Sequence, residues 1–280
     1  MSQNKSMELE SFPPFPIEAG DFRLAMGLRP VQPSDWLFKG PDHDQQMAER
    51  HRLFDQQPQD VVACEPSAEA AACVLHRLVT GEAAPGTGLE ALEAIGRTVQ
   101  EDMCILQSDG DDQPYHLMGG VLCFPNRWCL ADKLGKPLMA IHDPVPDYDR
   151  KLGPAVDRFF ARLKPDHITM RMNWSLHPDA VLFHPVAPQE QPSIEADDVS
   201  TQVFLRAERQ TIRRIEDVGP ATVLFTIRTM VAPLGAVLTD LDRVHRLDHA
   251  LATMPAALLA YKSMDTLVAP VRAWLAEQRP

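Results

Sequence analysis

The chain has 280 residues, enough for one large hydrophobic core or two smaller ones, and its 45% hydrophobic and 24% charged residues are typical of a globular protein. The 27 basic and 39 acidic residues give a formal net charge of −12, which disfavours nucleic acid as a partner and is compatible with a small cationic substrate or a basic protein. No apolar run is long enough to cross a membrane, and the N-terminal MSQNKSMELE lacks the basic start and apolar core of a signal peptide, so we expect a cytoplasmic protein.

The cysteines argue against several metal and disulfide classes. They are odd in number and contain no C-x-x-C pair, which disfavours a zinc ribbon, an iron–sulfur cluster and a disulfide framework. The absence of C-x-x-C-H means that any haem would be held non-covalently. We expect most of these residues to be small buried side chains. They are Cys64, Cys73, Cys104, Cys123 and Cys129.

The N-terminal third is predicted to be mostly helical. Residues 1–20 contain the segment FPPFP and are expected to form an arm on the surface. Apolar spacing then predicts helices over residues 45–54, 68–80 and 88–100, with Ser67 as the N-cap of the second.

The middle third changes to a strand pattern. Residues 103–107 and 115–124 are predicted to pair across the turn-rich SDGDDQP, and further strands are predicted over residues 167–176, 202–212 and 221–230. A helix over residues 155–163 and an acidic loop over 184–200 lie between them, and apolar spacing after Pro233 again predicts helices. The resulting class is α+β, with five mostly antiparallel strands in one sheet and helices on one of its faces.

These changes of pattern suggest three regions within a single structural domain. We divide the chain into an N-terminal arm and helical region over residues 1–100, a core over 101–232 and C-terminal helices over 233–280.

The segment over residues 115–150 contains the most suggestive candidate site. It runs from a strand through a basic and aromatic stretch to I-H-D-P-V-P, where two prolines fix the backbone just past His142. Such a turn presents an imidazole in a fixed orientation, as a metal ligand or catalytic group requires, although a satisfied structural histidine is the simpler interpretation. Nucleophile-elbow, phosphate-loop, dinucleotide-binding and H-E-x-x-H motifs are all absent.

The strand FLRAERQTI has an unusual density of long polar side chains. Alternation places Arg206, Glu208 and Gln210 on one face and Arg209 on the other. This pattern indicates either a polar wall of a site or an edge strand protected by charge, and the second interpretation is favoured on the residues alone. Arg228, in the apolar strand that follows, is either a snorkelling arginine or a clamp for a carboxylate or propionate.

Four segments in order carry a resemblance to a known family: GGVLCFPNRWCLADKLGKPLMAIHDPVPDY, RMNWSLHP, LRAERQTIRRI and VLFTIRTMVAPL. They resemble the haem-dependent oxidative N-demethylase family, which includes the haem subunit of bacterial dimethylamine monooxygenase. The similarity extends from FRLAMGLRP to the AYK of the C-terminal region. It implies a PAS-like five-stranded antiparallel sheet that holds haem b, with helical N-terminal and C-terminal extensions.

The resemblance also implies roles for individual residues. His142 would be the axial iron ligand, oriented by Asp143 and the backbone around Pro144. Glu208 and Trp174 would hold a cationic amine on the open face of the haem. Propionate partners are expected among Arg127, Lys133, Lys136 and Arg228. Arg206, Arg209 and Gln210 would polarise bound oxygen or orient Glu208.

The implied reaction converts a secondary amine such as dimethylamine, with dioxygen and two reducing equivalents, into a primary amine and formaldehyde. Because the chain has no nucleotide fingerprint or cluster cysteines, electrons must arrive from elsewhere. The resemblance implies a separate reductase with flavin and an iron–sulfur centre that uses NADPH. The family also associates formaldehyde release with tetrahydrofolate. Two alternatives remain: a haem-PAS sensor, and a non-catalytic subunit of an amine-oxidising complex.

Overall fold

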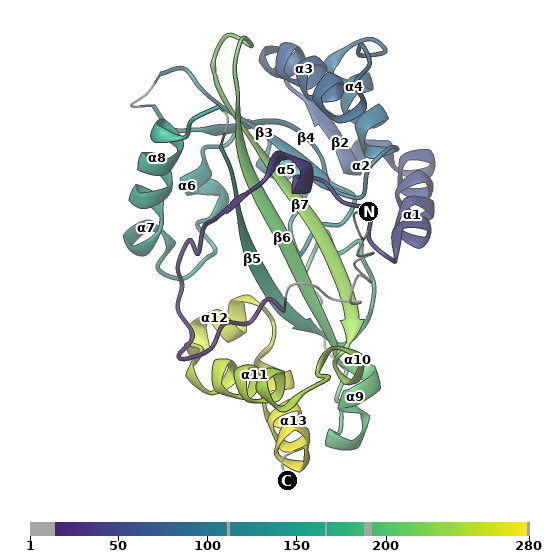
Figure 1. Ribbon diagram of the computed structural model, residues 1–280, viewed down its shortest axis with the longest axis vertical. Coiled ribbons are helices and arrows are strands. Elements are labelled where there is room, and N and C mark those ends of the chain that lie inside the picture. The colour runs from purple at the N-terminus through teal and green to yellow at the C-terminus, as the bar shows by residue number, and fades with distance from the viewer. Residues whose placement is uncertain (1–14, 111–112, 166, 188–191, 279–280) are drawn as a thin grey trace, which may run out of the picture.

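The computed structural model describes residues 15–110, 113–165, 167–187 and 192–278, and its centre is one twisted β-sheet (Figure 1). Seven strands lie in the order β1-β5-β6-β7-β3-β4-β2, and every neighbouring pair is antiparallel. The strands are β1 (Arg29–Val31), β2 (Val62–Cys64), β3 (Asp102–Ser108), β4 (His116–Val121), β5 (Ile168–His177), β6 (Phe204–Ile215) and β7 (Ala221–Pro233).

The predicted α+β class is confirmed, and the five long strands lie where they were expected. The strand count is wrong, because β1 and β2 have three residues each and are too short to produce a detectable alternation. The PAS-like five-stranded arrangement is therefore not confirmed.

The long helices begin and end close to their predicted bounds. Ser67 is not an N-cap, since it lies inside the 3₁₀ turn Pro66–Ala68, and α3 begins without a side-chain cap. By contrast, α4 begins with a reciprocal capping box between Thr87 and Glu90. The helices are α1 (His43–Gln56), α2 (Pro58–Val61), α3 (Glu69–Thr80), α4 (Gly88–Gly96), α5 (Leu130–Lys133), α6 (Leu138–Ile141), α7 (Tyr148–Lys151), α8 (Gly153–Arg162), α9 (Val199–Gln202), α10 (Leu234–Val237), α11 (Leu241–Thr253), α12 (Ala256–Tyr261) and α13 (Asp265–Glu277).

Helices cover both faces of the sheet, contrary to the expectation of one covered face. On the first face, Ile105 packs with α3 and α4 at one end, and Leu205 packs with α11 and α13 at the other. On the second face, Cys104 and Leu106 pack with α5, α6 and α8. Every residue of β3 is buried, so successive side chains meet a core on each side. The sheet is consequently a middle layer between two layers of helices, and no helix of the described residues is long and apolar enough to cross a membrane.

The pairing of β5 with β6 places one polar row on the second face. In this register Asn173 lies opposite Glu208 and Ser175 lies opposite Arg206. The short strand β1 pairs with β5 only as far as Met170, so the rest of β5 lacks a strand partner on that side in the described part of the chain. The end of α12 covers this edge, where the Lys262 ammonium donates to the carbonyl of Trp174 at 2.7 Å.

Candidate functional site

A buried carboxylate lies at the centre of the second face of the sheet. Glu208 is 7% exposed and accepts hydrogen bonds from three side-chain amides. Asn126 donates to Oε1 at 3.2 Å, while Asn173 and Gln210 donate to Oε2 at 3.2 and 2.9 Å. Since each carboxylate oxygen has two lone pairs, Glu208 retains capacity for a further donor.

Positive charge surrounds this carboxylate. Burial lowers the pKa of the guanidinium groups of Arg127, Arg171 and Arg206, and it lowers the pKa of the Lys262 ammonium to about 8. The charge of Glu208 acts in the opposite direction on Arg171, Arg206 and Lys262. The buried Arg206 and the partly buried Arg127, Arg171 and Lys262 thus lie around one buried carboxylate. We call these five residues with Asn126, Asn173 and Gln210 the Glu208 cluster.

Some of these cations have hydrogen-bonding capacity left over. The buried Nε atoms of Arg127 and Arg171 have no hydrogen-bond partner among the described residues. The Nε of Arg206 also lacks a partner in the described part of the chain, but its terminal nitrogens donate to four backbone carbonyls, including that of Phe124 at 2.7 Å, and Arg127 donates to the carbonyl of Lys262. An incompletely paired buried cation is costly, so the arrangement favours an anionic ligand beside Arg127 and Arg171.

His142 lies next to the Glu208 cluster, at the C-terminus of α6. Its Nδ1 is 2.8 Å from the carbonyl of Leu138, and its ring stacks on Tyr148 at 4.3 Å with an angle of 7°. A carbonyl can only accept, so Nδ1 carries the proton and Nε2 keeps its lone pair. Burial lowers the pKa of His142, and the charges of Arg171 and Lys133 act in the same direction. The ring is therefore neutral and held by Leu138, whereas Asp143 is exposed.

Arg171 connects the two parts of the site. Its charge lowers the pKa of both His142 and Lys262, and its own pKa responds to Glu208 and to the phenol of Tyr148. The carboxylate and the imidazole therefore belong to one electrostatic environment on the second face of the sheet.

Three of the predicted site residues lie on the other face, because they alternate with the polar row. Trp174 packs in the core with α11 and α13. Arg209 donates to the carbonyl of Trp36 at 3.0 Å, and Arg228 donates to the carboxylate of Asp42 at 2.6 Å. The structure does not bring Trp174, Arg209 or Arg228 together with Glu208.

Two predicted lysines lie on the segment before His142. The Lys133 ammonium donates to the carbonyl of Ile141 at 3.1 Å, one residue before the histidine. Lys136 is exposed, and its carbonyl accepts a hydrogen bond from the N–H of Leu117 in β4 at 3.1 Å.

A second polar chain extends from Asn126 toward the surface. The Asn126 amide donates to Ser175 Oγ at 3.3 Å, and Ser175 is 2.9 Å from Nε2 of His177. Burial and neighbouring cations lower the pKa of His177 to about 2. The ring of His184 lies beside it at a centroid distance of 5.4 Å, tilted by 40°, and its Nε2 is 3.0 Å from the carboxylate of Asp179.

Sequence reasoning did not single out several of these residues as a site. Arg171 and Asn173 were visible as alternate residues of a strand, which could have been matched with the polar row of β6. Lys262, Tyr148 and Asn126 gave no such signal, because only the tertiary fold brings them near Glu208.

Fold and site together define an α+β protein in which a neutral, oriented histidine adjoins a partly buried and mainly cationic cluster. A family model described as haem-dependent oxidative N-demethylase, alpha subunit-like, matches residues 72–271, and the chain belongs to this family. The match includes all the members of the Glu208 cluster and His142. A search of curated proteins found no match.

Proposed function

We propose that the chain is the haem-binding subunit of a monooxygenase that demethylates a small secondary amine, such as dimethylamine. The observation that carries this proposal is the incompletely paired positive charge of Arg171, which acts on the oriented ring of His142. Membership of the family supports haem dependence and oxidative N-demethylation as the general chemistry.

The residues present fit a b-type haem. A ligating histidine usually donates its second ring N–H to a carbonyl or carboxylate, as His142 does to Leu138, and it must be neutral. Haem needs only one protein ligand, so it does not require a cluster of three metal-binding side chains, and the described residues contain none. The two propionates are anions, which Arg171 and Arg127 are suited to pair, with Lys133 close to the histidine.

When bound, the haem would supply oxygen activation, and His142 would hold its iron. In the balanced reaction, dimethylamine, dioxygen, two electrons and two protons give methylamine, formaldehyde and water. One C–N bond of the amine is broken, and the methyl carbon is oxidised to formaldehyde.

The protein residues would bind and orient the amine. Dimethylamine is a cation at neutral pH, and Glu208 is the carboxylate that we assign to it, with the three amides fixing the carboxylate plane. The neighbouring cations oppose this binding until propionates neutralise part of their charge. Haem and amine binding should therefore be positively coupled.

Electrons would come from another protein. We assign this role to a reductase subunit with flavin and an iron–sulfur centre that uses NADPH, and the words "alpha subunit-like" suggest an assembly of several subunits. Tetrahydrofolate as an acceptor of formaldehyde and a cytoplasmic location complete the proposal.

An absorption spectrum of the purified protein, ferric and dithionite-reduced, tests the haem and its ligand. We expect a Soret band in the wild type and its loss or large shift in His142→Ala, with no change in the exposed control His51→Ala. No Soret band in the wild type after reconstitution with haemin would refute the proposal. With haem present, formaldehyde and methylamine should appear when dimethylamine, dioxygen and a reductant are supplied. Haem binding without any turnover would instead indicate a haem sensor.

A further inference from the structure

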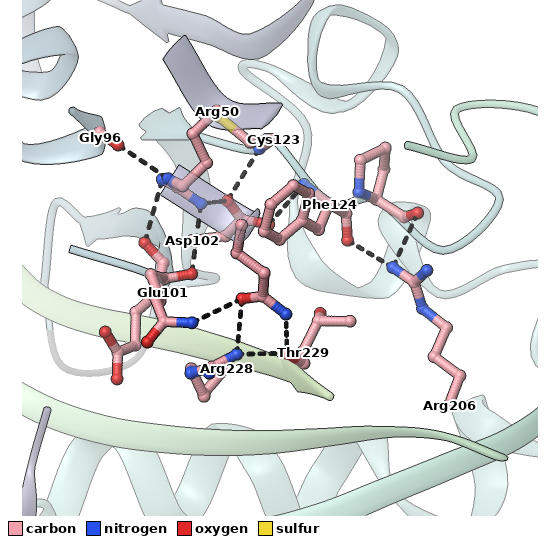
Figure 2. Close-up of polar contacts among 12 residues, drawn as sticks. Arg50, Gly96, Glu101, Asp102, Cys123, Phe124, Arg206, Arg228 and Thr229 are labelled. Carbon is pink, nitrogen blue, oxygen red and sulfur yellow. Dashed lines mark hydrogen bonds and ion pairs between the residues drawn. The ribbon is translucent and has the colours of Figure 1, made fainter. Parts of the chain in front are cut away.

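A buried ion pair at the start of β3 contacts the chain segment that leads into the Glu208 cluster (Figure 2). Arg50 of α1 and Asp102 of β3 lie 2.7 Å apart, and both side chains are 0% exposed. The Asp102 carboxylate also accepts the backbone N–H groups of Cys123 and Phe124, both at 2.8 Å. One carboxylate thus fixes two successive peptide units just after β4.

The guanidinium of Arg50 is itself fixed on several sides. It donates to the carbonyls of Gly96 at 2.7 Å, Glu101 at 3.2 Å and Gln100 at 3.3 Å, in addition to Asp102. These partners lie at the end of α4 and the start of β3, so the position of Asp102 is determined by two elements of the fold.

A second arginine holds the same segment from the side of the site. Arg206, a member of the Glu208 cluster, donates to the carbonyl of Phe124 at 2.7 Å and to that of Pro125 at 3.1 Å. Figure 2 shows Phe124 between the Arg50–Asp102 pair and Arg206. The N–H groups of residues 123–124 and the carbonyls of residues 124–125 are therefore all held by buried charged side chains.

The next two residues are part of the site. The Asn126 amide contacts both Glu208 and Ser175. Arg127 has a φ of 64°, a left-handed conformation that is unfavourable for a non-glycine residue and persists only where the surrounding structure imposes it. Its N–H donates to the carbonyl of His184 at 2.6 Å, and its guanidinium donates to the carbonyl of Lys262.

This arrangement is more than stability alone requires. A buried ion pair contributes little net stability compared with apolar side chains of the same volume, because both charges lose their hydration. Its distinctive effect here is to fix peptide groups that precede two site residues.

We propose that Arg50 and Asp102 are positioning residues that hold segment 123–127 so that Asn126 and Arg127 keep their places in the Glu208 cluster. This inference rests on the proposed function for its catalytic consequence, but its structural part can be tested without haem or amine. Asp102→Asn is the decisive variant, since an amide offers one acceptor oxygen for two N–H groups and leaves Arg50 without its counter-charge.

Hydrogen exchange of the haem-free protein, measured on peptides that cover residues 120–128, tests the positioning directly. Global stability is measured in parallel by urea unfolding. We expect Asp102→Asn to raise exchange in this segment at least about tenfold beyond the change that its global stability explains, which corresponds to roughly 1.4 kcal/mol of local opening. Leu75→Ala, a fully buried residue of α3, serves as the matched control and should show no such local excess. Equal protection in Asp102→Asn and the control would overturn the inference.

The affinity of the ferric haem protein for dimethylamine, measured by titration of its absorption spectrum, tests whether the positioning matters for the site. We expect Asp102→Asn to weaken binding and Leu75→Ala to leave it unchanged. If Asp102 acts through Asn126, the double variant with Asn126→Ala should bind no more weakly than Asn126→Ala alone, and fully additive losses would contradict this route.

If Asp102→Asn does not fold, Arg50→Lys keeps a positive charge and should show a smaller increase in exchange. A wild type that binds no haem would refute the proposed function and leave the exchange experiment decisive.

Discussion

Arg171 offers a prediction in which stability and haem affinity change in opposite directions. No hydrogen bond or close ion pair of this side chain is found among the described residues, its Nε is buried without a partner, and burial lowers its pKa. Glu208 compensates its charge only in part. Replacement of a buried ion pair by apolar groups of similar volume is often neutral or stabilising by ~1–4 kcal/mol, and the influence of Glu208 on Arg171 argues for the low end. We therefore expect Arg171→Met to stabilise the haem-free protein by about 1 kcal/mol.

The same substitution removes the proposed partner of a propionate. A hydrogen bond to a charged group contributes roughly 1.5–3 kcal/mol, so haem should bind about tenfold to a hundredfold more weakly. Urea unfolding of the haem-free protein and haemin titration followed at the Soret band measure the two effects.

Arg214→Met in β6 is the matched control. Arg214 donates to Tyr115 Oη at 3.2 Å and to the carbonyl of Phe160 at 3.0 Å. Its loss should destabilise the protein by about 1 kcal/mol and leave haemin affinity unchanged. A destabilised Arg171→Met that binds haemin as tightly as the wild type would refute the reasoning.

Two further predictions concern pH. Burial lowers the pKa of Lys262 from 10.5 to about 8, so the unfolded chain binds more protons than the folded protein between pH 8 and 10.5. The free energy of unfolding of the wild type, measured in urea, should therefore rise by about 3 kcal/mol over this range relative to that of Lys262→Met. The same pH dependence in both proteins would contradict the burial of a charged amine. Because the pKa of His177 is lowered from 6.5 to about 2, only the unfolded chain binds a proton at this side chain just below pH 6.5. The free energy of unfolding should therefore decrease, as the pH is lowered below 6.5, by up to about 1.4 kcal/mol per pH unit. His177→Gln should flatten this acid limb, and an unchanged slope would show that other groups cause it.

Much of the sheet could be predicted from the sequence because its long strands carry a clear signal. The β5 pattern, apolar on one side and polar on the other, reflects one face in a hydrophobic core and one face in the site. The same alternation correctly separated Arg206, Glu208 and Gln210 from Arg209. It also places the side chains of Trp174 and Asn173 on opposite faces of the sheet. The family resemblance nevertheless assigned both Trp174 and Glu208 to the site.

The rest of the site depends on tertiary contacts that leave no local pattern. Lys262 reaches β5 from a helix almost ninety positions later in the chain, and its contact with Asn173 could not be inferred from spacing. The turn at His142 was visible through its prolines, but the partner of the ring is the carbonyl of Leu138, a backbone group that no side-chain pattern reveals. The edge strands β1 and β2 could not be predicted for a different reason. Three residues carry no detectable pattern, and such a segment is a strand only because it pairs with a neighbouring strand in the fold.

The order of the strands also has a consequence for folding during synthesis on the ribosome. The central ladder joins β3, residues 102–108, to the first part of β7, residues 221–227. While the ribosome makes the intervening segment, one edge of β3 has no native partner. At typical rates of about 5–20 residues per second, this interval lasts on the order of 6–20 s. A buried apolar strand whose edge stays unpaired for so long is prone to aggregation. Co-expression of a chaperone that binds exposed strands of nascent chains should therefore raise the yield of folded protein.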